Sequence, residues 1–143
     1  MPHDAFDLER FVLAQAPVID AVYGELRDGR KRSHWMWFVF PQLAALGASA
    51  TAKRFGISSL AQARAYLDHP VLGPRLRECC ALLLAVQGRS IEEILGHPDD
   101  LKLRSCLTLF QLAAPGEDAV FSECLSKFYG GVPDSRTLAL CAD

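Results

Sequence analysis

The chain has 143 residues, of which 50% are hydrophobic and 22% charged, and its formal net charge is -2. A chain of this length is the size of one domain and can bury a core without disulfides or metal ions as supports. The composition argues against disorder and coiled coil, and the charge provides no basic surface for duplex nucleic acid. We therefore expect one domain spanning residues 1–143 that does not bind nucleic acid.

The compartment is indicated by the first residues, the apolar runs and the cysteines. Residues 1–7 are polar and acidic, unlike a signal peptide. The longest apolar runs, residues 35–40 and 81–86, are far shorter than the roughly 18 residues of a membrane span. Five cysteines form an odd set, and four of them lie in apolar helical patterns, which predicts buried free thiols. These features predict a soluble cytoplasmic protein with no membrane association and no cofactor, and they leave the oligomeric state open.

Apolar residues recur at helical spacing in the first third of the chain. This pattern predicts a helix from about Asp7, its N-cap, to Gln15, and a second helix that ends at Asp28-Gly29. Ser33 is predicted to cap a short helix over residues 34–40, although a buried strand of that length fits equally well. A loop or single turn over residues 43–48 and a short helix over residues 50–55 complete this part.

Helix signals are clearer in the rest of the chain. Ser59 with Gln62 and Ser90 with Glu93 read as capping boxes, and Asp99 or Asp100 is expected to cap another helix. Further helices are predicted from Pro74 to Gly88, over 119–128, and around Leu138 and Leu140. Strand alternation is nearly absent. The expected fold is all-α, a single compact domain of about eight short helices. The pattern leaves open one small hairpin in addition.

Residues 31–42, which we call the opening block, contain both tryptophans and have polar residues at either end of an apolar run. This composition is suited to a planar, anionic ligand. Trp35 and Trp37 would stack on it, while Lys31, Arg32 and the Ser33 hydroxyl would meet a phosphate. The alternative interpretation places both tryptophans in the core.

Two polar residues near this run are further candidates for ligand contact. His34 is the more plausible functional residue, with a purely structural histidine as the alternative. Gln42 closes the run directly after Pro41. We expect His34 and Gln42 to line the same site as the tryptophans.

The segment from Asp99 to Ser105 is a second candidate. Its carboxylates are explained equally well as residues that favour the helix dipole. Lys102 and Ser105, three positions apart, share one helix face, whereas Asp100 does not share it. If this helix start meets the opening block, a carboxylate, a lysine and an indole surround one cleft, as in sugar and nucleotide sites.

Glu9 is the remaining candidate. It lies on the flank of an apolar stripe, where an exposed carboxylate is the default interpretation. As a catalytic group it would stabilise an oxocarbenium-like transition state or activate water at an anomeric carbon. The four histidines are too dispersed along the chain for a metal site, so no metal is predicted.

Nearly the whole chain resembles the bacterial family of domain of unknown function 1810. The resemblance rests on residues 7–12 with Gln15, residues 33–38 with 40–42, Leu46-Gly47 with Ser49, residues 65–67 with His69-Pro70, Asp99-Asp100 with Lys102-Leu103 and Ser105, residues 108–110, and Gly131 with Thr137-Leu138. It implies an all-helical single domain and transfers no activity.

A fainter similarity links residues 83–109 to the C-terminal half of the NADAR superfamily, which is helical and acts on NAD or ADP-ribose derivatives. The residues that carry it are Leu83-Leu84, Gly88, Ile91, Glu93, Asp99 and Leu109. The Gly-rich elements of that superfamily are absent, and residues 102–105 occupy their place.

These observations give two hypotheses. The first is a pocket for a nucleotide-type or ADP-ribose-type ligand, extending to N-glycosidic hydrolysis, with Glu9, Asp100 and Lys102 as the catalytic groups. The ligand-binding residues of this hypothesis are Lys31, His34, Trp35, Trp37, Gln42 and Ser105. The second is a non-enzymatic helical interaction or structural module, in which the tryptophans are core and the polar residues only cap helices. Convergence of Glu9, His34, Asp100 and Lys102 on one open cleft distinguishes the two.

Overall fold

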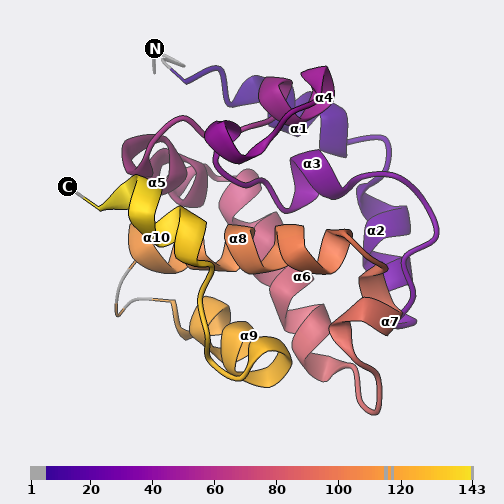
Figure 1. The fold of residues 1–143 in the computed structure, drawn as a ribbon. Coiled ribbons are helices and arrows are strands. Elements are labelled where there is room, and N and C mark those ends of the chain that lie inside the picture. Colours follow the sequence, from indigo (N-terminus) through magenta and orange to yellow (C-terminus); the bar gives the residue numbers. More distant parts are fainter. Residues whose placement is uncertain (1–5, 115, 117, 143) are drawn as a thin grey trace.

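Periodic apolar residues fold into short helices along the chain (Figure 1). The computed structural model describes residues 6–114, 116 and 118–142, and within them it has ten α-helices, one 3-10 helix and no β-strand. In chain order they are α1 (Glu9–Gln15), α2 (Ile19–Arg27), α3 (Met36–Val39), η1 (Ala44–Leu46), α4 (Ala50–Arg54), α5 (Leu60–Asp68), α6 (Leu72–Ala85), α7 (Ile91–Leu95), α8 (Asp99–Ala113), α9 (Ala119–Tyr129) and α10 (Ser135–Cys141). The predicted all-α class is confirmed, with slightly more helices than the expected eight.

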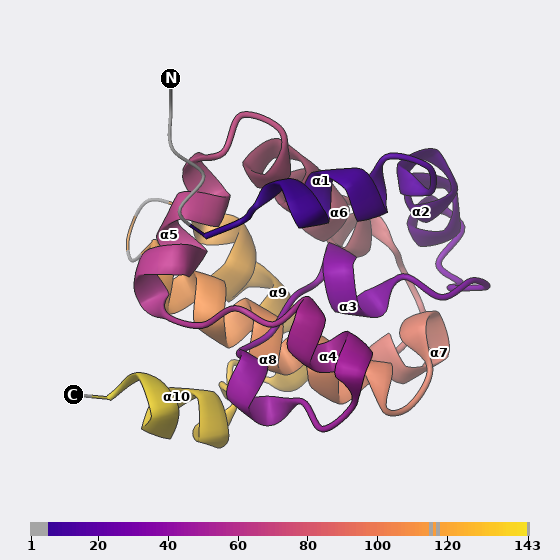
Figure 2. The ribbon, with the colours of Figure 1, turned by 90° about the horizontal axis from the view of Figure 1, so that it is seen from above.

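Helix α8 lies in the centre of the fold. It crosses the middle of the molecule and packs against α5, α7, α9 and α10, while α3 lies near its first turns (Figures 1 and 2). The burial pattern explains this position, because every residue from Leu103 to Phe110 except Arg104 is buried. A helix that is apolar on nearly all sides must be surrounded by other elements. None of the helices in the described residues is both long and apolar enough to cross a membrane.

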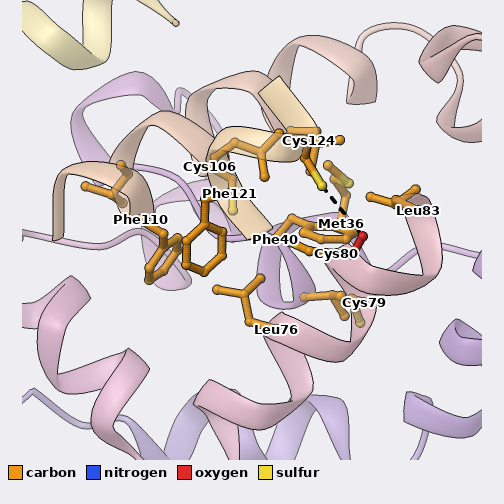
Figure 3. Close-up of a cluster of buried hydrophobic side chains, with 14 of the residues drawn as sticks. Met36, Phe40, Leu76, Cys79, Cys80, Leu83, Cys106, Phe110, Phe121 and Cys124 are labelled. Atoms are coloured by element: carbon orange, nitrogen blue, oxygen red, sulfur yellow. Dashed lines mark hydrogen bonds between the residues drawn. The ribbon is translucent and has the colours of Figure 1, made fainter. Parts of the chain in front are cut away.

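Between α6, α8 and α9, aromatic and sulfur-containing side chains pack with leucines in one part of the hydrophobic core (Figure 3). Cys79, Cys80, Cys106 and Cys124 are all buried free thiols, as predicted, and Cys141 is partly exposed. Burial raises the pKa of Cys79 to about 12 and that of Cys106 well above its usual range. These thiols therefore pack as small apolar groups rather than as nucleophiles.

Of the two predicted capping boxes, the one at Ser90 is complete and the one at Ser59 has only its first hydrogen bond. Ser90 and Glu93 exchange both reciprocal hydrogen bonds at the start of α7. At α5 the Ser59 hydroxyl accepts from the Gln62 N–H as expected, but the Gln62 side chain accepts from Ser58 instead of Ser59. The local pattern identifies the helix start, and the neighbouring serine decides the second bond.

Three predicted caps are wrong. Asp7 lies outside α1 with a positive φ of 50°, and the N-cap is Leu8 without a side-chain bond. Asp99 and Asp100 are the first helical residues of α8, whose N-cap is Pro98. Ser33 does not cap α3, because its hydroxyl donates to a carboxylate of α2 and α3 begins only at Met36.

The opening block forms a helix rather than a strand, but a shorter one than predicted. Only Met36–Val39 is helical, and Phe40 leaves the helical conformation before Pro41. The small hairpin that the sequence left open is absent from the described residues, where a single parallel bridge joins Leu43 to Ile57. Gln42, the neighbour of Leu43, lines a hollow together with residues of the first turns of α8, where the candidate site lies.

Candidate functional site

Asp99 lies between two lysines at the start of α8. Its Oδ2 is 3.1 Å from Lys31 Nζ and its Oδ1 is 3.3 Å from Lys102 Nζ. The side chains of Lys31 and Asp99 are only 9% and 16% exposed, so this ion pair is better shielded than a surface pair. Lys31 also donates its backbone N–H to the carbonyl of Ile94 in α7 at 2.7 Å. The opening block and the start of α8 therefore meet at Asp99.

Each of these lysines also lies over a tryptophan ring. Lys31 Nζ is 5.1 Å from the ring centroid of Trp35, and Lys102 Nζ is 4.4 Å from that of Trp37, within the range of cation–π attraction. Trp35 is completely buried, whereas Trp37 is half-buried. Trp35 is thus a core residue, and of the two tryptophans only Trp37 is partly accessible to a ligand.

Glu25 in α2, which was not identified from the sequence, holds the residues before α3 in place. Its carboxylate accepts hydrogen bonds from the N–H groups of Arg32 and Ser33, the Ser33 hydroxyl and the Trp35 indole N–H, at 2.6–3.1 Å. Partial burial alone raises the pKa, but these hydrogen bonds outweigh it and lower the pKa of Glu25 to about 2. The sequence does point to a structural role for Glu25. It follows Val22 by three residues within an apolar stripe, where a carboxylate needs hydrogen-bond partners.

A hollow of about 390 Å³ lies beside this cluster, between the first turns of α8, the start of α10 and the segment after α3. We call it the α8–α10 hollow. Three of the predicted residues, Gln42, Lys102 and Ser105, line it together. The remaining lining residues are Leu46, Pro98, Leu101, Arg104, Asp134 and Arg136.

Positive charge predominates in the α8–α10 hollow. Arg104 and Arg136 form no ion pair with any carboxylate of the described residues, and Lys102 shares Asp99 with Lys31. Arg104 is oriented by a 2.9 Å hydrogen bond from its Nε to a backbone carbonyl in the segment before α10. Among the described residues, the carboxylate that lines the hollow is that of Asp134, and it already accepts the N–H and hydroxyl of Thr137 at the start of α10.

Neither arginine was identified as a site residue from the sequence. Arg104 lies between Lys102 and Ser105, which were both predicted site residues. Its closeness to the site could therefore have been inferred from the sequence. Arg136 gave no signal, because only the packing of α10 against α8 brings it to this place.

Asp100 lines a different hollow from Lys102. This second hollow, of about 430 Å³, lies between the start of α7, the start of α8 and the end of α9, and we call it the α7–α9 hollow. One oxygen of the Asp100 carboxylate is 3.0 Å from His97 Nδ1. The two hollows share Leu101, whose side chain stands at their common edge.

Glu9 and His34 lie apart from these residues. Glu9 lines a third hollow with Arg10, Leu13 and Arg54 on the outer side of α1 and α4. His34 is exposed in the segment before α3, and it is not among the residues that form ion pairs with Asp99 or that line the α8–α10 hollow in the described part of the chain. Glu9 is therefore not assembled with Asp100 and Lys102, whose two neighbouring hollows share Leu101 but no residue with the hollow of Glu9.

The site contains few groups suited to a metal ion. Within the part of the chain that the structure describes, no three histidine, cysteine, aspartate or glutamate side chains lie together in a way that could hold one. The chemistry available to the α8–α10 hollow is thus electrostatic attraction and hydrogen bonding by cations, an amide and a hydroxyl.

Comparison with known proteins gives one family and one closely similar structure. The family model described as a protein of unknown function (DUF1810) matches residues 5–141. The crystal structure of the conserved hypothetical protein Rv1873 from Mycobacterium tuberculosis has a TM-score of 0.96 and 61% sequence identity, covering 98% of this chain and 99% of that one. No functionally curated protein matches. Because the family model spans almost all of the sequence, the chain belongs to the DUF1810 family.

Proposed function

We propose that this protein binds a small phosphorylated ligand of the nucleotide type, with a phosphate in the α8–α10 hollow. The observation that carries the proposal is that Arg104, Arg136 and Lys102 surround one hollow while the two arginines have no described carboxylate partner. Guanidinium groups bind phosphate through paired, charge-assisted hydrogen bonds. The volume of the α8–α10 hollow, about 390 Å³, lies in the range of small-molecule pockets.

The uncharged lining supports a ligand with an organic part. Leu46, Pro98 and Leu101 provide apolar contact, and the Gln42 amide can donate to and accept from a polar edge. The Ser105 hydroxyl donates to the Leu101 carbonyl at 3.3 Å, so its oxygen is available as an acceptor. A phosphate attached to a partly apolar body fits this arrangement better than a free inorganic anion.

The proposal concerns binding and not hydrolysis. N-glycosidic hydrolysis needs a carboxylate beside the anomeric carbon. Of the two predicted catalytic carboxylates, Glu9 lines the hollow beside α1 and α4 and Asp100 lines the α7–α9 hollow, so neither lines the hollow of the proposed phosphate site.

Isothermal titration with AMP, ADP-ribose and adenosine tests the proposal. We expect AMP and ADP-ribose to bind and adenosine to bind at least about tenfold more weakly, because the phosphate supplies the charge-assisted contacts. Arg136→Gln and Arg104→Gln should each weaken AMP binding about tenfold, and added salt should weaken it further.

Arg27→Gln is the matched control, since Arg27 is exposed at the end of α2 and lines none of these hollows. Absence of binding by both phosphorylated ligands, or equal losses in Arg27→Gln and Arg136→Gln, would show that the α8–α10 hollow is not a phosphate site.

A further inference from the structure

The α7–α9 hollow differs in chemistry from the α8–α10 hollow beside it. Of the described residues, two cations and two carboxylates line it, and their charges balance; these are Arg89, Lys127, Glu92 and Asp100. The remaining lining is Ser90, Ile91, Leu101, Phe128 and Tyr129. A second phosphate would gain little from this charge balance.

Both cations of the α7–α9 hollow are bound to backbone carbonyls. Arg89 Nε donates to the carbonyl of Gly29 at 2.9 Å. Lys127 Nζ donates to the carbonyls of Leu84 and Val86 at the end of α6. These contacts fix the two cations as parts of the wall and reduce the donors they can offer to a ligand.

The carboxylates, in contrast, retain free acceptor oxygens. One oxygen of Asp100 is near His97, and its other oxygen accepts no hydrogen bond from the described residues. Glu92 is exposed at the edge of the hollow and accepts none. An ionised carboxylate can only accept hydrogen bonds, so its natural ligand partner is a hydroxyl or N–H donor. Acidic residues accept ribose hydroxyls in this way in nucleotide sites.

Tyr129 connects the two hollows. Its hydroxyl donates to the backbone carbonyl of Asp100, and the Arg104 guanidinium carbon lies 5.5 Å from its ring centroid. Tyr129 thus contacts Asp100, which lines the α7–α9 hollow, and Arg104, which lines the α8–α10 hollow. The aromatic ring provides an apolar surface of the kind that packs against the C–H face of a sugar.

Asp100 and Arg104 lie close together on one face of α8. They are four residues apart, so their Cβ atoms are neighbours on the helix surface at roughly 5–6 Å. Leu101, which is 50% exposed, lines both hollows, so the two hollows adjoin each other there.

We infer that the two hollows form one site for a pentose phosphate, free or as part of a nucleotide. The phosphate is bound by Arg104, Lys102 and Arg136, and the sugar hydroxyls donate to Asp100 and Glu92 over Tyr129. This inference rests on the proposed phosphate site and adds the second hollow, with the residues that bind the sugar hydroxyls.

Titration with ribose 5-phosphate and with pentyl phosphate tests the inference, because these ligands share a phosphate and a five-carbon skeleton but differ in hydroxyls. We expect the wild-type protein to bind ribose 5-phosphate about tenfold more tightly, as hydrogen bonds to charged groups contribute at this level. In Asp100→Asn, and separately in Glu92→Gln, this difference should fall to about twofold or less. Removing a carboxylate changes the attraction for both phosphates alike, so the difference between the ligands isolates the hydroxyl contacts.

Glu123→Gln, at an exposed position of α9 outside both hollows, should keep the full difference. Circular dichroism melting checks that Asp100→Asn folds. If Asp100→Asn does not fold, the ligand difference measured in Glu92→Gln tests the inference. Equal wild-type affinity for the two ligands, or a difference that persists in the variants, overturns the pentose assignment while the phosphate site stands. Failure of both ligands to bind overturns the phosphate site as well.

Discussion

The indole N–H of Trp35 donates to the carboxylate of Glu25 at 3.0 Å, and both residues are buried. The same carboxylate accepts three further hydrogen bonds from residues 32 and 33. The path of the chain from α2 to α3 therefore depends on one charged group. Because this path carries Lys31 to Asp99, Glu25 is a positioning residue for the candidate site.

Replacement of Glu25 by glutamine should lower stability in a pH-dependent manner. At neutral pH we expect a loss of about 2 kcal/mol, since an amide cannot accept from four donors as a carboxylate does. The pKa of Glu25 is lowered from its ordinary value of 4.5 to about 2. Its contribution is thus fully present above about pH 4.5 and is lost as the pH falls towards 2.

Urea denaturation of the wild-type and Glu25→Gln proteins across this pH range measures the effect. The difference in free energy of unfolding should shrink steadily below about pH 4.5. Glu123→Gln, whose carboxylate is exposed, provides the control and should show no such trend. A constant difference between wild type and Glu25→Gln down to pH 2 would contradict the assigned role.

Asp99→Asn should destabilise the protein by about 2 kcal/mol, because it leaves Lys31 shielded from water without its counter-charge. The comparison variant is Asp28→Asn, which breaks a pair with Arg32 whose side chains are 54% and 56% exposed. This surface pair should contribute less than about 0.5 kcal/mol. Thermal melting of both variants measures the two losses of stability. Similar losses in Asp99→Asn and Asp28→Asn would contradict the role of burial at Asp99.

Gly73→Ala and Gly24→Ala should have opposite effects on stability. A Cβ at Gly73 would overlap the carbonyl oxygen of Leu67, so we expect a loss of about 2 kcal/mol from forced movement of α6 against α5. Gly24 lies within α2 with no atom within 4 Å of an added Cβ, and alanine there should stabilise by about 0.5–1 kcal/mol. Denaturant titration of both variants checks the signs, and a stable Gly73→Ala protein would mean that the two helices separate easily.

Native protein should expose one reactive thiol. Cys141 is partly accessible, whereas the other four cysteines are buried, and burial raises the pKa of Cys79 to about 12. Thiolate is the reactive form, so these four should not react with Ellman's reagent until the chain unfolds. Cys141→Ser should abolish the native reaction and leave the reaction in guanidinium intact. Rapid modification of a second native thiol would show that the core between α6, α8 and α9 opens.

The amino-acid sequence by itself determined the all-α class, the positions of most helices and the burial of four cysteines. These features follow from short-range rules, since apolar spacing, prolines and glycines act within one or two helical turns. The resemblance to the DUF1810 family likewise came from local motifs, and the match over residues 5–141 confirms it. The expected caps at Asp7, Ser33 and Asp99 are wrong for different reasons. Asp7 lies one residue before the N-cap of α1, and Asp99 lies one residue after the N-cap of α8. The Ser33 hydroxyl donates to Glu25 instead of capping α3.

Only the tertiary structure decided which polar residues meet. Gln42, Lys102 and Ser105 come together through packing between segments more than 50 positions apart, and Arg136 joins them from α10. Glu9, equally suggestive in the sequence, is carried by α1 to another hollow. Side-chain convergence depends on how helices pack across the core, and this packing is set by long-range contacts that local periodicity does not encode.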